Sequence, residues 1–276
     1  MSAINTNLAS LNAQRNLSSS ESSLNTSIQR LSSGLRVNSA KDDAAGLSIA
    51  TKMDSQIRGM TQAVRNANDG ISMAQTADGG LATAIDALQR MRELAVQGSN
   101  ETIDTASDGA NLDKEYQALA TEVARIATDT KFNGKAILSS TSAITKIQVG
   151  ADNGSTTIDI PKTDLSAQAT LVGASGAGVS DRSKSQTALT TIDTALAAIN
   201  TMRADLGASQ NRMGFAVSNL QSSVENQSAA KSRIMDTDFA SETAKLTRGQ
   251  ILQQAGTAML AQANSAPNGV MALLRG

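Results

Sequence analysis

A single heptad register runs unbroken through 46 residues in the second half of the chain, from residue 189 to residue 234. Its members, spaced alternately by three and four residues, are Leu189, Ile192, Leu196, Ile199, Arg203, Leu206, Gln210, Met213, Val217, Leu220, Val224, Gln227, Lys231 and Ile234. This spacing is typical of a helix that buries one stripe against other helices. Such a helix would be about 70 Å long, which exceeds the width of a small domain. The chain must therefore form a rod or a bundle of long helices.

The same register recurs in the first half of the chain and predicts partner helices. A second run covers residues 53–88, and a shorter third run covers residues 112–126. Asp42 or Asp43 is expected to cap the start of the second helix, and Gly98 to end it in a left-handed conformation. We therefore predict a mainly α protein whose rod is a long antiparallel coiled coil or helical bundle.

The central region differs from the helical runs because it is rich in Gly, Ser and Thr, with short β-branched stretches. Asn133 and Gly134 predict a two-residue hairpin turn, since both central residues of a type I′ turn need positive φ. Two short strands, 147–149 and 158–160, are expected around a turn at 152–154. The glycines that follow predict a flexible return. We expect a small β excursion in this central region, at one end of the rod.

The first 35 and the last 40 residues carry thinner apolar stripes than the rod helices. The members of these stripes that hold heptad spacing are Leu17, Leu24, Ile28, Leu31 and Leu35 near the start, and Leu252, Ala255 and Met259 near the end. A lone helix with so little apolar surface is marginal in water, because most helical stability comes from packing. We therefore expect both ends to become ordered only when they pack on each other and on further copies of the chain.

The composition excludes most catalytic and metal sites. The chain has no cysteine and no histidine, which rules out Ser/His/Asp triads, Cys/His dyads, zinc clusters and disulfides. Asp42 and Asp43 have no third carboxylate at ligand spacing, which favours helix capping over metal binding. Four aromatic residues and a net charge of -1 argue against nucleic acid and anionic lipid as partners. We expect no enzyme, no cofactor, no metal and no membrane segment.

Motifs at both ends of the sequence resemble those of bacterial flagellin. Those in the first half are LNAQRNL (11–17), QRLSSGLRVNSAKDDAAGLSIA (29–50), RNANDGISMAQTADGGL (65–81), LQRMRELAVQ (88–97) and FNGKAIL (132–138). Those near the carboxyl end are SRIMDTDFASETAKLTRGQILQQAGTAMLAQAN (232–264) and GVMALLR (269–275). The resemblance is specific, because it leaves only about residues 140 to 180 unmatched.

The resemblance implies an inner tube of terminal helices, a surrounding rod and a short central insert. The expected segments are an inner-tube helix with a connector (1–43), the first part of the rod (44–139), a variable β and loop insert (140–184), the second part of the rod (185–232) and a second inner-tube helix (233–276). Packing in the inner tube and polymerisation are expected of Leu17, Leu24, Ile28, Leu31, Leu35, Leu252, Ala255, Met259, Leu273 and Leu274.

The function that the resemblance implies is mechanical. Subunits would leave the cell through the flagellar type III apparatus and polymerise into an extracellular filament for motility. The implied partners are further copies of the chain, an export chaperone, and the cap and junction proteins. A hook-filament junction protein is the alternative within the same apparatus, and a cytoplasmic signalling hairpin is a further one.

The segment LQRMRELAVQ also resembles the patch of flagellin that host innate receptors recognise. The resemblance implies receptor contacts for Arg90 and Leu94, with Glu93 beside them. Because residues four apart share one side of a helix, we expect Arg90 and Leu94 to face solvent together. An acidic partner from the next helix is expected near Glu115 or Gln117. The alternative is that this face only packs in the rod.

Overall fold

The structure is a computed structural model that describes residues 7–101, 107–140, 144–151, 156–174 and 177–275, with side chains as far as residue 265. The described residues form six helices and two small antiparallel hairpins, which confirms the mainly α fold class. The chain divides into two compact units. The terminal unit combines residues 1–55 with 226–276, and the central unit comprises residues 56–225.

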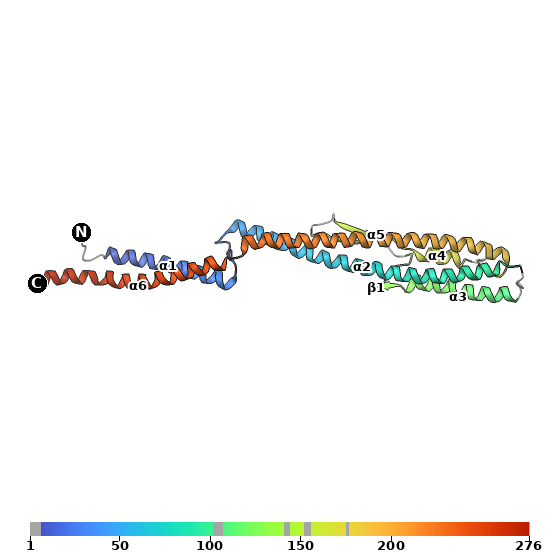
Figure 1. Cartoon of the computed structure of the whole chain (residues 1–276), viewed down its shortest axis with the longest axis horizontal. Coiled ribbons are helices and arrows are strands. Elements are labelled where there is room, and N and C mark those ends of the chain that lie inside the picture. The colour runs from blue at the N-terminus through green and yellow to red at the C-terminus, as the bar shows by residue number, and fades with distance from the viewer. Residues whose placement is uncertain (1–6, 102–106, 141–143, 152–155, 175–176, 276) are drawn as a thin grey trace. The chain divides into compact units, whose positions relative to one another are not determined.

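Two long helices form the framework of the central unit (Figure 1): α2 spans Ala44–Gly98 and α5 spans Arg182–Met235. They are antiparallel, because Arg92 bonds to Asp193, whereas Asp78, earlier on α2, bonds to Arg203, later on α5. The predicted heptad helix is confirmed. In the central unit every second member of its register is buried, namely Ile192, Ile199, Leu206, Met213 and Leu220. The stripe that was visible in the sequence is therefore the core of this unit.

Two shorter helices complete the helical part of the central unit. α3 (Asp108–Asp129) is the predicted third helix, whereas α4 (Leu165–Val172) lies where only strands and loops were expected. The buried Tyr116 of α3 joins the two, since its hydroxyl donates to the carbonyl oxygen of Val172 at 3.2 Å. Burial raises the pKa of Tyr116 to about 12. The insert thus contributes a helix to the core.

The first hairpin has the predicted turn. β1 (Lys131–Phe132) pairs with β2 (Lys135–Ala136), and Phe132 lies opposite Lys135. The two residues between them, Asn133 and Gly134, have φ values of 48° and 77°. This pair of positive φ angles is the one that a type I′ turn requires.

The second hairpin consists of β3 (Thr145–Gln148) and β4 (Thr157–Ile160), which are antiparallel. The turn predicted at 152–154 lies outside the described residues. The hairpin packs closely on α2, because a Cβ added at Gly70 would come within 3.0 Å of Cγ1 of Ile147. Ile158 and Ile160 are buried in the main hydrophobic cluster. The hairpin therefore lies against the middle of α2, so the expectation that it would stand at one end of the rod was wrong.

The terminal unit is built on an antiparallel pair of helices, α1 (Leu8–Ser33) and α6 (Phe239–Arg275). Figure 1 shows the two side by side. Glycines of α6 receive leucines of α1: a Cβ at Gly256 would lie 3.1 Å from Leu17, and one at Gly249 would lie 3.2 Å from Leu24. α1 ends at Gly34, whose φ of 72° is left-handed.

The start of α2 confirms the predicted cap, but its end does not follow the prediction. Oδ1 of Asp43 accepts the N–H of Gly46 at 2.8 Å, which is the bond of an N-cap. Asp42 shapes the preceding turn, where hydrogen bonds from Ser39 hold the pKa of its carboxyl below the ordinary value. Gly98 has no left-handed φ, so the prediction for it was wrong. Its Cβ would lie 2.8 Å from the carbonyl oxygen of Val179, so this glycine permits a close backbone approach instead.

Candidate functional site

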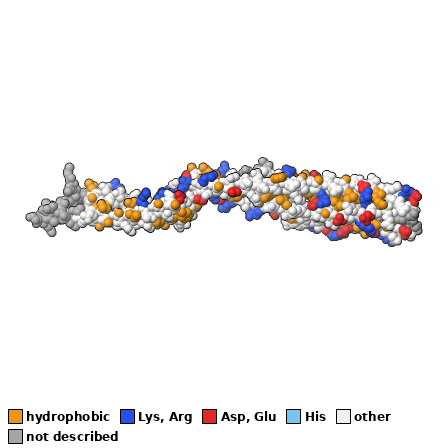
Figure 2. Space-filling model, viewed as in Figure 1, with side chains coloured by type: hydrophobic (Ala, Val, Ile, Leu, Met, Phe, Trp, Pro, Cys, Tyr) orange, Lys and Arg blue, Asp and Glu red, His pale blue; other side chains and the backbone are white. Residues whose placement is uncertain are grey.

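The terminal helices expose much of their apolar side-chain surface. In α1 the only buried residue is Ser27. Figure 2 shows hydrophobic side chains along the surface of these two helices. The large apolar side chains that the terminal unit exposes are Leu8, Leu11, Ile28, Ile49, Phe239, Ile251, Leu252 and Met259. Exposed apolar side chains in this number make the terminal unit a candidate surface for contact with another protein.

The apolar stripe predicted for the two ends separates into two sets. The half-buried set comprises Leu17, Leu24, Leu31 and Leu35. The exposed set comprises Ile28, Leu252, Ala255 and Met259. Leu273 and Leu274 lie outside the residues whose side chains are described. The contacts within the helix pair therefore use one part of the stripe and leave the other part open.

A cluster of charged side chains joins α2 to α3 at the segment expected to meet receptors. Nε of Arg90 donates to Oε1 of Glu115 at 2.9 Å, and Nη1 of Arg90 donates to Oε2 of Glu93 at the same distance. These hydrogen bonds, first that to Glu93, raise the pKa of Arg90. Of the two positions considered for an acidic partner, the structure brings Glu115 to Arg90, whereas Gln117 bonds to the carbonyl oxygen of Ala177.

Leu94 does not face solvent with Arg90, so this prediction was wrong. Its residue surface is 1% exposed, and it belongs to the main core cluster together with Leu88 and Ala95. The physical reason is that two helices flank α2 here, since Arg90 bonds to Glu115 of α3 and Arg92 to Asp193 of α5, and this widens the buried arc of the helix. Arg90, only slightly further round the helix, keeps its long side chain at the edge of that arc.

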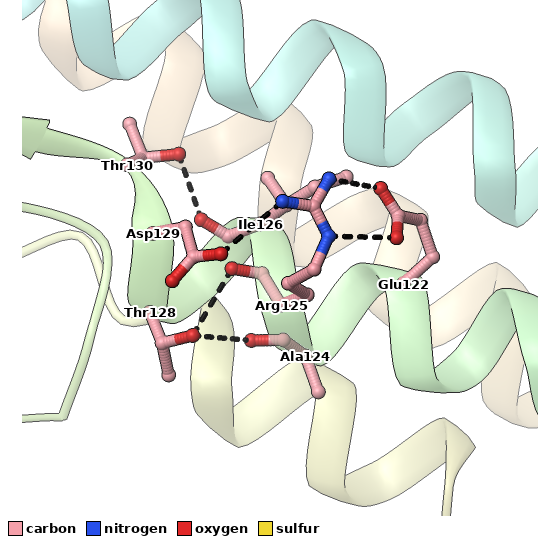
Figure 3. Close-up of polar contacts among 7 residues, drawn as sticks. All are labelled: Glu122, Ala124, Arg125, Ile126, Thr128, Asp129 and Thr130. Atoms are coloured by element: carbon pink, nitrogen blue, oxygen red, sulfur yellow. Dashed lines mark hydrogen bonds and ion pairs between the residues drawn. The ribbon is translucent and has the colours of Figure 1, made fainter.

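A second exposed arginine, Arg125, provides a contrast (Figure 3). Its guanidinium lies between Glu122 and Asp129, both on the same helix, at 2.6 and 3.1 Å. The hydrogen bonds that its guanidinium donates, first those to Glu122, raise the pKa of Arg125. Arg125 thus supports its own helix only, whereas Arg90 joins two helices.

A groove of about 570 Å³ lies between α1 and α6, and no motif in the sequence predicts it. Its charged lining is Arg30, Glu242, Lys245 and Arg248, and its hydroxyl lining is Ser19, Ser20, Ser23, Thr26 and Ser27. Glu242 is 4% exposed and accepts hydrogen bonds from Ser27 and Lys245 at 2.8 and 3.0 Å. Lys245 and Arg248, three residues apart, share a helix face, but no spacing in the sequence connects them with Arg30.

The described residues contain no group of three or more metal-ligating side chains close enough to hold an ion. Nor does any described helix combine the length and the apolar character needed to cross a bilayer.

Two family models match the chain. The bacterial flagellin N-terminal helical region matches residues 4–143, and the bacterial flagellin C-terminal helical region matches residues 189–274. The chain belongs to the bacterial flagellin family. A flagellin of Halalkalibacterium halodurans is 47% identical over 273 residues, which are 99% of each chain. A flagellin of Xenorhabdus nematophila is 43% identical, again with 99% of both chains covered.

A solved structure agrees with this assignment. The crystal structure of Bacillus cereus flagellin is 34% identical, has a TM-score of 0.51, and covers 60% of this chain and 94% of that one. This chain is thus a flagellin, a structural subunit of the flagellar filament. The matches give no support to the alternative of a hook-filament junction protein.

Proposed function

We propose that copies of this flagellin join through α1 and α6, and that these helices form the inner part of the filament. The observation that carries the proposal is the exposed apolar surface of a helix pair in which α1 buries only Ser27. Burying apolar surface is worth about 25 cal/mol per Å². Neighbouring copies would supply the cover that a single copy lacks.

A filament requires contacts that do not close. When different patches of two copies meet head to tail, the same contact can repeat without end and produce an open helix. The terminal helices fit this requirement because their exposed set (Ile28, Leu252, Ala255, Met259) remains available after α1 and α6 have paired. The half-buried leucines would hold the pair together within each copy.

Two isoleucines of similar exposure test the proposal. Ile251 on α6 is 60% exposed, and Ile144 in the central unit is 56% exposed. Seeded assembly of purified Ile251→Ser is expected to need a protein concentration about tenfold higher than the unchanged chain, which corresponds to about 1.4 kcal/mol per contact. Ile144→Ser serves as the matched control. Equal assembly of the two variants would contradict the proposal.

We propose further that the subunit is exported and works outside the cell. Family membership supports an export chaperone before secretion, and cap and junction proteins at the filament ends, as partners. The chain should be found in sheared filaments of a normal strain. In a strain without the flagellar type III apparatus it should stay in the cell lysate, and immunoblotting of both fractions decides the matter.

We also propose that host innate receptors contact the charged cluster of Arg90, Glu93 and Glu115. The cluster is supported as a contact surface because its side chains are 46 to 67% exposed and Arg90 holds them in place through one ion pair within α2 and one to α3. Leu94 would act indirectly, by fixing the position of α2 in the core.

A further inference from the structure

The groove between α1 and α6 holds more positive than negative charge. Three cations line it, and Glu242 is their one carboxylate. Both oxygens of Glu242 are already engaged, Oε1 by Ser27 and Oε2 by Lys245. Among the residues that the structure describes, neither Arg30 nor Arg248 forms a hydrogen bond or ion pair with a carboxylate, although the charge of Arg30 acts on Glu242 and Asp42 from a longer distance.

Arg30 also has an unmet hydrogen bond. Its Nε is enclosed and has no acceptor among the described residues. An enclosed donor without a partner is costly, and a charged one more so. The groove thus has the chemistry to accept a carboxylate.

One carboxylate of the terminal unit, by contrast, lacks a cation or a hydrogen-bond donor. Asp42 and Asp43 shape the turn before α2, and Asp238 accepts from the N–H of Ala240. The remaining ones also have partners: Asp54 with Lys231, Asp236 with Ser232, and Glu242 with Lys245. Among the carboxylates that the structure describes in this unit, Glu21 alone has no hydrogen bond or ion pair.

Glu21 cannot enter the groove of its own copy. It is two residues from Ser23, which lines the groove, and two residues turn an α-helix by about 200°. The carboxylate and the groove therefore lie on opposite faces of α1. Only another molecule can bring them together.

We propose that, in the filament, Glu21 of one copy enters the α1–α6 groove of the next copy and pairs with Arg248 and Arg30. The inference rests on the proposed assembly through the terminal helices. A carboxylate on one face of the copy and a cationic groove on the opposite face make a contact that repeats from copy to copy without forming a closed ring, as a filament needs. Charge complementarity of this kind fixes the register between copies more than it adds affinity.

Charge reversal tests the pair in the full-length chain. Glu21→Arg and Arg248→Glu are each expected to raise the protein concentration needed for seeded assembly about tenfold or more, because each places like charges together. The double variant restores the pair with its ends exchanged, so it should assemble within about threefold of the unchanged chain. Lys114→Glu, a reversal of an exposed lysine on α3, is the control for altered net charge. Circular dichroism of each monomer checks that the helices persist.

The outcomes separate this proposal from the one on which it rests. If Glu21→Arg assembles normally, or if the double variant is as poor as the two single variants combined, Glu21 does not occupy the groove. The proposed assembly through α1 and α6 would still stand if Ile251→Ser fails to assemble. If Ile251→Ser assembles normally, the assembly surface itself is wrong. Only a double variant that recovers assembly supports an ion pair between Glu21 of one copy and Arg248 of the next.

Discussion

Leu94 and Arg90 lie one turn apart on α2 but have different surroundings. Leu94 is enclosed by the core, whereas the guanidinium of Arg90 lies at the surface between two carboxylates. Truncation of a buried leucine leaves a cavity, and truncation of an exposed arginine removes ion pairs that water screens. We therefore expect the free energy of unfolding to distinguish the two side chains.

Leu94→Ala is expected to lower the free energy of unfolding by about 2 to 5 kcal/mol. Arg90→Ala should lower it by less than about 1 kcal/mol, because its ion pairs are exposed. Urea unfolding of the full-length chain, followed by circular dichroism, measures both. A loss of equal size in the two variants would show that Arg90 belongs to the core after all.

Receptor recognition gives a second prediction for these residues. Arg90→Ala should reduce receptor signalling by about tenfold or more while the chain stays folded, since a contact residue at a binding hot spot is worth about 2 kcal/mol. Arg125→Ala is the matched control, because Arg125 is also exposed and paired with two carboxylates. Signalling that falls equally for both variants would point to a general effect of charge.

Single residues also show which positions can be predicted from the sequence and which cannot. The cap at Asp43 and the turn at Asn133 and Gly134 were predictable, because each depends on neighbours in the chain. Leu94 and Gly98 were not, because their positions depend on α3, α5 and Val179, which are distant in sequence. Periodicity gives the direction of a side chain on a helix, but not the width of the face that its neighbours cover.

Among the helices, α1 and α6 are joined through Glu242, whose contact we expect to weaken at low pH. Burial raises the pKa of Glu242, but hydrogen bonds from Ser27 and Lys245 outweigh it and hold the pKa below the ordinary value of 4.5. A carboxyl with a lowered pKa in the folded state stabilises that state above the unfolded-state pKa. This contribution is lost as the pH falls from about 4.5 through the lower folded-state value.

Filaments should therefore dissociate on acidification, partly through Glu242. Sedimentation of assembled protein from about pH 6 to about pH 3 measures the loss. Glu242→Gln removes the titrating group, so its filaments should be weaker at neutral pH and should change less over the same interval. A pH profile parallel to that of the unchanged chain would exclude Glu242 as a contributor.

The long helices were predictable as elements, and α4 was not. A heptad register over dozens of residues predicts both α2 and α5. α4 has eight residues, LSAQATLV, whose apolar positions i, i+4 and i+7 repeat only once, within a region whose Gly, Ser and Thr content indicated loops. It becomes helical where Leu165, Ala169 and Val172 are buried in the core of the central unit. A helix this short depends mainly on that packing, although Asp164 caps its start by accepting the N–H of Ala167.

The terminal helices α1 and α6 should differ from the core helix α5 in amide hydrogen exchange. Burying one leucine is worth about 1.5 to 3 kcal/mol, and fixing the backbone of each residue costs about 1 to 2 kcal/mol. α1, with no buried apolar side chain, should exchange rapidly in the monomer, as should α6, and both should become protected in filaments. Amides near Ile192 and Leu206 should be slow in both states. Strong protection at Leu24 and Met259 before assembly would refute this expectation.

The molecule as a whole combines a unit with a core and a unit without one. The central unit contains the main cluster of buried apolar residues, to which α2, α3, α4, α5 and the β3–β4 hairpin contribute. The terminal unit has most of its apolar side chains half-buried or exposed. The family motifs in the sequence had indicated both parts, although the groove between α1 and α6 needed the structure.

Removal of either end should abolish assembly and leave the central unit folded. A chain without residues 1–35, or one without residues 240–276, keeps residues 56–225 and their core. We expect it to remain soluble, with a cooperative unfolding transition at nearly the same urea concentration as the central unit of the full chain. It should form no filaments on seeding, because α1 or α6 is missing from each copy and the other helix then loses its partner. Electron microscopy and sedimentation after seeding provide the measurement, and filaments from either truncated chain would place the assembly surface in the central unit.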